Sequence, residues 1–279
     1  MNLHLPILIG TTYKFWSISV SSIASILLLL CLYPAQGSAH DTWLEAGAAT
    51  VPVGEYTYVD LMLGNHGNDH RDFKLASKIM LDPCTLSVVD PTGSTLDLKS
   101  AITDMGNAEK EGFWTAKYVF ANPGLHHFVH TLDTLHRTTR AIKSAKTFVV
   151  ATDGGESSTG LDHPDICHGF GLELVLKTPF ATIEAGQPIE LQVMRSGKPL
   201  SEARVTFVPR GTTLAADFDS DYERISDSEG CVTFVPKEGN VLFAVVHHMA
   251  EDESGDGYEN THYSAAVVIQ VPNHAIRHR

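Results

Sequence analysis

Histidine is the residue type in this 279-residue chain with the clearest chemical use. The sequence contains 15 histidines, several of them close together. Neutral imidazole is a common ligand of zinc, copper and nickel ions, whereas magnesium and calcium prefer oxygen ligands. The histidine content therefore indicates a transition-metal site as the first chemistry to consider.

His40 is the first candidate ligand, because it is expected to begin the mature protein. Residues 23–33 form an apolar run, and Gly37 and Ala39 supply the small residues of a signal-peptidase site with cleavage between Ala39 and His40. A terminal histidine offers its α-amine and its imidazole to one ion, and both nitrogens lose their protons at little cost near neutral pH. An uncleaved N-terminal membrane anchor is the alternative interpretation.

Other histidines would have to complete such a site. Adjacent strand residues point to opposite faces of a sheet, so only one of His247 and His248 is expected to face a common centre. His126 and His130 flank Phe128 on one strand face, which leaves joint chelation by these two open. For each histidine the alternative is an ordinary exposed or core side chain. The candidates to join His40 are His66, His127, His247 and His248.

The elements that must position these residues are predicted to be β-strands. Apolar residues alternate with polar ones, or form short continuous runs, between turns rich in Gly, Pro, Asn and Asp. The expected fold is all-β, with two immunoglobulin-like β-sandwich domains in tandem after a signal peptide. The predicted divisions are a signal peptide at 1–39, a first sandwich at 40–150, a Gly/Ser/Asp-rich linker at 151–169, a second sandwich at 170–272 and a tail at 273–279.

Composition and motifs exclude several function classes. The formal net charge of −13 argues against nucleic acid as a partner, since binding to phosphates depends on clustered Lys and Arg. The sequence contains no Gly-x-Ser-x-Gly elbow, no His-Glu-x-x-His motif, no phosphate-binding loop and no dinucleotide fingerprint. No small organic substrate is evident. Glu173, Glu184 and Glu190 are expected to lie on solvated strand faces.

Cysteine usage does not indicate a disulfide framework. Removal of residues 1–39 leaves Cys84, Cys167 and Cys231. An exported protein could pair two of these and leave one thiol, or pair none.

Several short motifs, in their order along the chain, resemble an exported nickel/cobalt-uptake family typified by the NikK-like periplasmic component. The resemblance implies a two-domain β protein that binds Ni²⁺ or Co²⁺ outside the inner membrane, and it matches His40, His66 and His247 to family histidines. The motifs are His-Asp-x-Trp-Leu at 40–44, Gly-Asn-His at 64–66, the segments 169–175 and 183–200, the Asp-Ser-Glu-Gly turn at 227–230, and Val-Val-His-His at 245–248.

The leading hypothesis is a non-catalytic periplasmic or secreted protein that binds a transition metal. Nickel or cobalt is favoured, copper and zinc are alternatives that nitrogen ligands permit, and a membrane metal-uptake complex is the expected partner. A copper-dependent redox enzyme using a terminal-histidine chelate is the first alternative function. A structural or carbohydrate-binding β-sandwich module, in which the histidines are incidental, is the second.

Overall fold

The computed structural model describes residues 40–65, 74–154, 165–215 and 218–274, and these residues form β-strands joined by turns. Two short 3₁₀ turns, Lys99–Ala101 and Phe180–Thr182, are the helical elements among them. The strands are β1 (Asp41–Ala46), β2 (Thr50–Pro52), β3 (Tyr56–Asn65), β4 (Lys74–Leu75), β5 (Cys84–Val89), β6 (Thr95–Asp97), β7 (Ile102–Asp104), β8 (Trp114–Val119), β9 (Gly124–His136), β10 (Thr139–Thr152), β11 (Leu172–Leu176), β12 (Ile189–Arg195), β13 (Lys198–Pro199), β14 (Arg204–Pro209), β15 (Glu223–Ile225), β16 (Cys231–Phe234), β17 (Asn240–Ala250) and β18 (Asn260–Val271).

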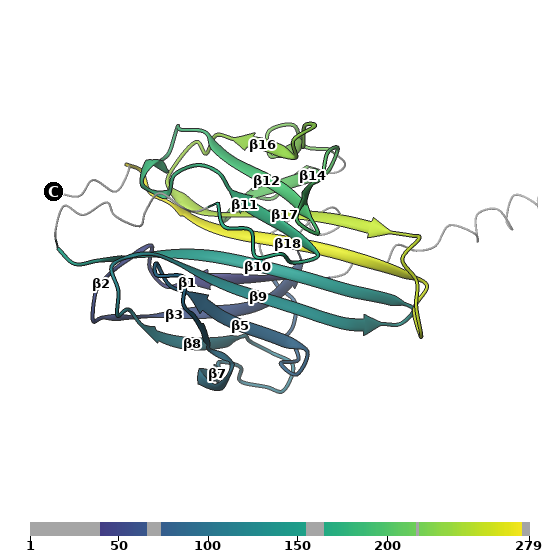
Figure 1. The fold of residues 1–279 in the computed structure, drawn as a ribbon, viewed down its shortest axis with the longest axis horizontal. Helices are drawn as coiled ribbons and strands as arrows, with labels where there is room; N and C mark the ends of the chain where they lie inside the picture. The colour runs from purple at the N-terminus through teal and green to yellow at the C-terminus, as the bar shows by residue number, and fades with distance from the viewer. Residues whose placement is uncertain (1–39, 66–73, 155–164, 216–217, 275–279) are drawn as a thin grey trace, which may run out of the picture. The chain divides into compact units, whose positions relative to one another are not determined.

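The strands make three sheets. A central nine-stranded sheet has the order β15-β14-β17-β18-β10-β9-β5-β6, with β2 also paired to β10. A five-stranded sheet has the order β1-β3-β8-β7 with β4 beside β3, and a four-stranded sheet joins β11, β12, β13 and β16. The long strands β9, β10, β17 and β18 cross the middle of the molecule (Figure 1). The predicted all-β, sandwich-like class is confirmed.

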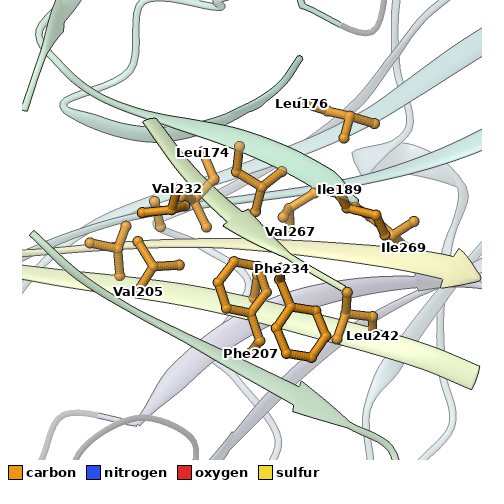
Figure 2. Close-up of a cluster of buried hydrophobic side chains, with 14 of the residues drawn as sticks. Leu174, Leu176, Ile189, Val205, Phe207, Val232, Phe234, Leu242, Val267 and Ile269 are labelled. Atoms are coloured by element: carbon orange, nitrogen blue, oxygen red, sulfur yellow. The ribbon is translucent and has the colours of Figure 1, made fainter. Parts of the chain in front are cut away.

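The central sheet has a hydrophobic core on each face. Successive residues of β17 divide between the cores, since Leu242 packs with the four-stranded sheet and Phe243 with the five-stranded sheet. Figure 2 shows part of the core against the four-stranded sheet. In this core the rings of Phe207 and Phe234 stack with centroids 4.6 Å apart. Burial on both faces explains why the central strands are continuous apolar runs in the sequence.

The two halves expected from the sequence share this central sheet. β10 of the first half pairs in parallel with β18 of the second over nine residue pairs, from Thr139–Asn260 to Thr147–Val268. The chain from Ala39 to Arg279 forms one compact unit. The exact linker boundary at 151–169 stays a prediction, because residues 155–164 lie outside the described residues, as does the predicted signal peptide.

Two smaller findings bear on the sequence analysis. In the described part of the chain, no helix is long and apolar enough to cross a membrane. Cys84, Cys167 and Cys231 are all free thiols. The structure thus corresponds to the unpaired alternative for these cysteines.

Candidate functional site

One face of the central sheet carries a row of polar side chains among apolar ones. His247 on β17 pairs with Ser264 on β18, and Ser264 pairs on its other side with Lys143 on β10. Paired residues in a sheet point to the same face, and His262 lies two positions from Ser264 on that face. This is the face that packs against the five-stranded sheet, where β1 lies against β10 and β18.

His247, His262 and Asp41 meet on this face. The Nδ1 atom of His247 lies 3.2 Å from Nε2 of His262, and the two rings stack with an interplanar angle of 20°. The Nε2 atom of His247 lies 3.4 Å from Oδ2 of Asp41, which is almost completely buried at the start of β1. Three strands from two sheets therefore bring two imidazoles and a carboxylate together.

The nearby carboxylate favours one tautomer of His247 through its charge, rather than through a hydrogen bond to Nε2. A carboxylate attracts the N–H of the imidazole, so Asp41 favours the tautomer with the proton on Nε2. The lone pair of His247 then lies on Nδ1 and points toward His262. A metal-bound histidine characteristically has its other nitrogen directed at a carboxylate or a carbonyl in this way.

Burial, helped by nearby positive charge, keeps the imidazole of His262 neutral. Burial together with the charges of His247 and Lys143 lowers the pKa of His262 to about 4, against the opposing effect of Asp41. Burial also lowers the pKa of Lys143, whereas the charge of Asp41 raises it. His262 therefore carries a lone pair, rather than a charge, at neutral pH.

Lys143 connects this cluster to His40. Its side chain is buried, and its ammonium donates a hydrogen bond to the main-chain carbonyl oxygen of His40. The residue expected to begin the mature protein is thus held by its carbonyl at the same face, directly before Asp41 in the chain.

The other predicted ligands do not join this group. His66 lies outside the described residues. His248 follows His247 on β17 and so points to the opposite face, where its ring lies 6.4 Å from that of Tyr263. His127 also lies on the opposite face, with its ring 5.1 Å from Phe148 and 5.8 Å from His168. A site centred on His247 therefore includes neither His127 nor His248.

His126 and His130 share a strand face, but each is engaged separately. The Nδ1 atom of His126 lies 3.1 Å from the carbonyl oxygen of Gly124, and that of His130 lies 2.7 Å from the carbonyl oxygen of Thr85. Four residues of strand separate their backbones by about 13 Å. Joint chelation of one ion by these two histidines, left open by the sequence, does not fit this geometry.

The two facing nitrogens of the cluster are spaced as two ligands of one ion would be. Ligands about 2.1 Å from a metal are about 3.0–3.4 Å apart at octahedral or tetrahedral angles, and the observed separation is 3.2 Å. Within the described ranges, no three His, Cys, Asp or Glu side chains are arranged to hold a metal ion. The described side chains thus supply two nitrogen ligands, and further ligands have to come from elsewhere, such as the free amine that cleavage before His40 would create.

Sequence reasoning missed His262 and Asp41 as members of the cluster. His262 stands just before the apolar run that begins at Tyr263, so its place inside strand β18 is not evident from that run. Asp41 was recognised only as part of the His-Asp-x-Trp-Leu motif. Period-two alternation extended back to Asn260 would have placed His262 on the face of Ala266 and Val268.

A second polar cluster on the opposite face corrects another expectation. Glu173, expected on a solvated face, is fully buried, and its Oε2 lies 2.5 Å from Nζ of Lys146. It accepts hydrogen bonds from the backbone N–H groups of His168 and Phe170 and from the thiol of Cys167. Burial alone would raise the pKa of Glu173, but the charge and hydrogen bond of Lys146 hold it below its usual value. The cluster fastens residues 167–170 to the central sheet.

Comparison with known proteins gives a family but no described function. A family model described as "Domain of unknown function (DUF4198)" matches residues 37–249. Comparison with curated proteins finds no match.

Similar solved structures include several other β proteins. The D0–D1 domain of intimin is 14% identical over 82% of this chain and 97% of that chain, with a TM-score of 0.22. The adhesin InvE of Yersinia pseudotuberculosis is 14% identical over 85% and 62%, with a TM-score of 0.22. A DUF4785 family protein of Legionella pneumophila is 10% identical over 73% and 50%, with a TM-score of 0.30. At such scores nothing about the function of this chain is inferred from them.

Proposed function

We propose that this chain, which belongs to the family described as a domain of unknown function (DUF4198), is a non-catalytic binding protein for a divalent transition-metal ion, with nickel or cobalt favoured over copper and zinc. His247 Nδ1 and His262 Nε2 are the ligand atoms, and Asp41 orients His247. The α-amine and imidazole of His40 complete the set after cleavage between Ala39 and His40. Export to the periplasm or the cell exterior, and delivery of the ion to a membrane metal-uptake complex, belong to the same proposal.

One observation carries the proposal, namely the 3.2 Å separation of two imidazole nitrogens beside a buried carboxylate. In the absence of a metal ion the same separation accommodates one hydrogen bond, with Nε2 of His262 donating to Nδ1 of His247. The metal-free pair and the metal-bound pair both need an unprotonated nitrogen on at least one ring. The lowered pKa of His262 favours an unprotonated nitrogen there. For a divalent ion to bind there, the proton of His262 would move from Nε2 to Nδ1, so that both facing nitrogens offer lone pairs.

Nitrogen ligands favour the later first-row metals. Imidazole and amine nitrogens suit nickel, copper, cobalt and zinc, whereas a site for magnesium or calcium would consist of oxygen atoms. Affinity alone ranks copper above nickel and cobalt, so the preference for nickel or cobalt rests on the resemblance to the uptake family.

Calorimetric titration of the protein beginning at His40 with Ni²⁺, Co²⁺ and Cu²⁺ tests the proposal. We expect one ion to bind per chain, with a dissociation constant well below about 1 mM. A protein beginning at Ala39, one residue longer, is the matched control and should bind at least tenfold more weakly. Absence of binding tighter than about 1 mM in both forms would contradict the proposal, as would oxygen consumption by the copper form with a reductant, which would indicate a redox enzyme.

A further inference from the structure

Lys143 is a buried lysine on β10. Its alternation partners on the same strand face, Ala145 and Val149, belong to the hydrophobic core against the five-stranded sheet. An ammonium group in such a position costs free energy unless charged or polar partners compensate it. The buried ammonium of Lys143 therefore needs charged or polar partners.

The partners of Lys143 belong to the start of the predicted mature chain. Its ammonium donates to the carbonyl oxygen of His40, and the charge of Asp41 stabilises its protonated form. The other groups that face it across the sheet are His262 and His130, whose positions on β18 and β9 flank it. These imidazoles are neutral, because burial lowers the pKa of each to about 4.

We propose that Lys143 is a positioning residue for the metal site, which holds the backbone of His40 so that the terminal amine and imidazole lie beside His247 and His262. This inference rests on the proposed function. The first residue of a chain usually frays, and ordering it at the moment of binding costs conformational entropy. A hydrogen bond from a buried ammonium removes much of that cost beforehand.

A purely electrostatic role for Lys143 predicts the opposite effect. A positive charge close to the cluster repels a divalent cation, so removing the charge would strengthen metal binding. The positioning role predicts that removing the charge weakens binding, and only when His40 is the first residue. The sign of the effect and its dependence on the start of the chain distinguish the two.

The test is a set of metal titrations on four proteins: wild type and Lys143→Met, each beginning at His40 or at Ala39. Methionine retains most of the apolar stem and loses the donor. We expect the substitution to weaken Ni²⁺ binding at least tenfold in the form that begins at His40 and to leave the form that begins at Ala39 within about twofold. Lys143→Arg, which keeps a charged donor, should recover part of the loss, and Lys198→Met, at an exposed position, should change nothing.

Equal losses in both forms, unchanged binding or tighter binding would each overturn the positioning role. A second measurement needs no metal: an aminopeptidase should remove His40 at least tenfold faster from Lys143→Met than from wild type, and equal rates would also overturn it. If wild type binds no metal, the proposed function has failed. The aminopeptidase rates then still decide whether Lys143 holds His40. If Lys143→Met does not fold, the rate at which the aminopeptidase removes His40 is compared between wild type and Lys143→Arg. Rapid removal of His40 from wild type would overturn the inference.

Discussion

His262 faces His247 across a gap of 3.2 Å between their nearest nitrogens, although the two residues belong to different strands of the central sheet. The two side chains lie diagonally on adjacent antiparallel strands, since His247 pairs with Ser264 and His262 pairs with Met249. Diagonal neighbours in a sheet reach one another only when their side chains are long or aromatic. The stacked imidazoles meet this requirement and leave their nitrogens adjacent.

Replacing His262 by alanine should abolish most of the metal affinity. The substitution removes one of the three imidazoles of the proposed site, so the loss should exceed the tenfold to hundredfold effect typical of residues that only support a ligand. His248→Ala is the matched control, because His248 lies next to His247 but points to the opposite face. Calorimetry with Ni²⁺ measures both, and equal affinities of the two variants would contradict the assignment of His262.

Replacing Asp41 by asparagine should weaken binding without removing a ligand. The amide keeps the size of the side chain but loses the charge that holds the proton of His247 on Nε2. We expect the affinity for Ni²⁺ to fall by about 10- to 100-fold, the range found for residues that orient a histidine ligand. Asp97→Asn, on the exposed strand β6, is the control and should bind like wild type. A wild-type affinity for Asp41→Asn would show that the carboxylate does not orient the ring.

Acid should destabilise the fold between about pH 6.5 and pH 4. Burial lowers the pKa of His130 to about 4, below the ordinary value of 6.5. In this interval the unfolded chain binds a proton that the folded chain excludes, so the free energy of unfolding decreases as the pH falls, by roughly 1 kcal/mol per pH unit for this residue. Well above pH 6.5 and well below pH 4 the contribution of His130 no longer changes with pH.

Urea unfolding at several pH values in the absence of metal measures this effect. His130→Gln and His130→Asn should both be less stable at neutral pH, because they disturb a packed interior. Both should nevertheless show a shallower decrease of unfolding free energy between pH 6.5 and pH 4 than wild type. If both variants keep the wild-type slope, His130 is not the group that takes up the proton.

Replacing Glu173 by alanine should destabilise the protein severely. The change leaves the ammonium of Lys146 buried without its carboxylate and removes the acceptor for the N–H groups of His168 and Phe170. Breaking a buried ion pair from one side costs about 3–5 kcal/mol. Glu190→Ala, at an exposed position of β12, is the control and should change the free energy of unfolding by less than about 0.5 kcal/mol. Urea midpoints for the two variants check this, and similar midpoints would contradict the role of Glu173.

Local patterns in the sequence predicted the strands better than the sheets. Period-two alternation identified β8 and most of β18, and it correctly divided His247 and His248 between opposite faces. Sequence alone could not show that β10 pairs with β18, because the paired residues Thr139 and Asn260 are more than a hundred positions apart and both strands are largely buried on both faces. Register over such distances is decided by three-dimensional packing.

The candidate site could be predicted only in part, because strand pairing over long distances also brings its residues together. His247 was identified because a doublet at a strand end is conspicuous, and His40 because it follows a recognisable cleavage motif. His262, Asp41 and Lys143 meet only after three separate strand pairings have formed, so no local motif joins them. Glu173 was assigned to solvent because alternation cannot distinguish an exposed strand face from one covered by a loop.

The pairing of β10 with β18 has a consequence for folding during synthesis. β18 is the last strand of the described residues, and until it arrives β10 presents an open edge of unpaired N–H and C=O groups to any other extended polypeptide. The core against the five-stranded sheet contains residues of β17 and β18, so it cannot close while the C-terminal residues are still on the ribosome. A chain interrupted after β17 would be prone to join with its own copies through that edge.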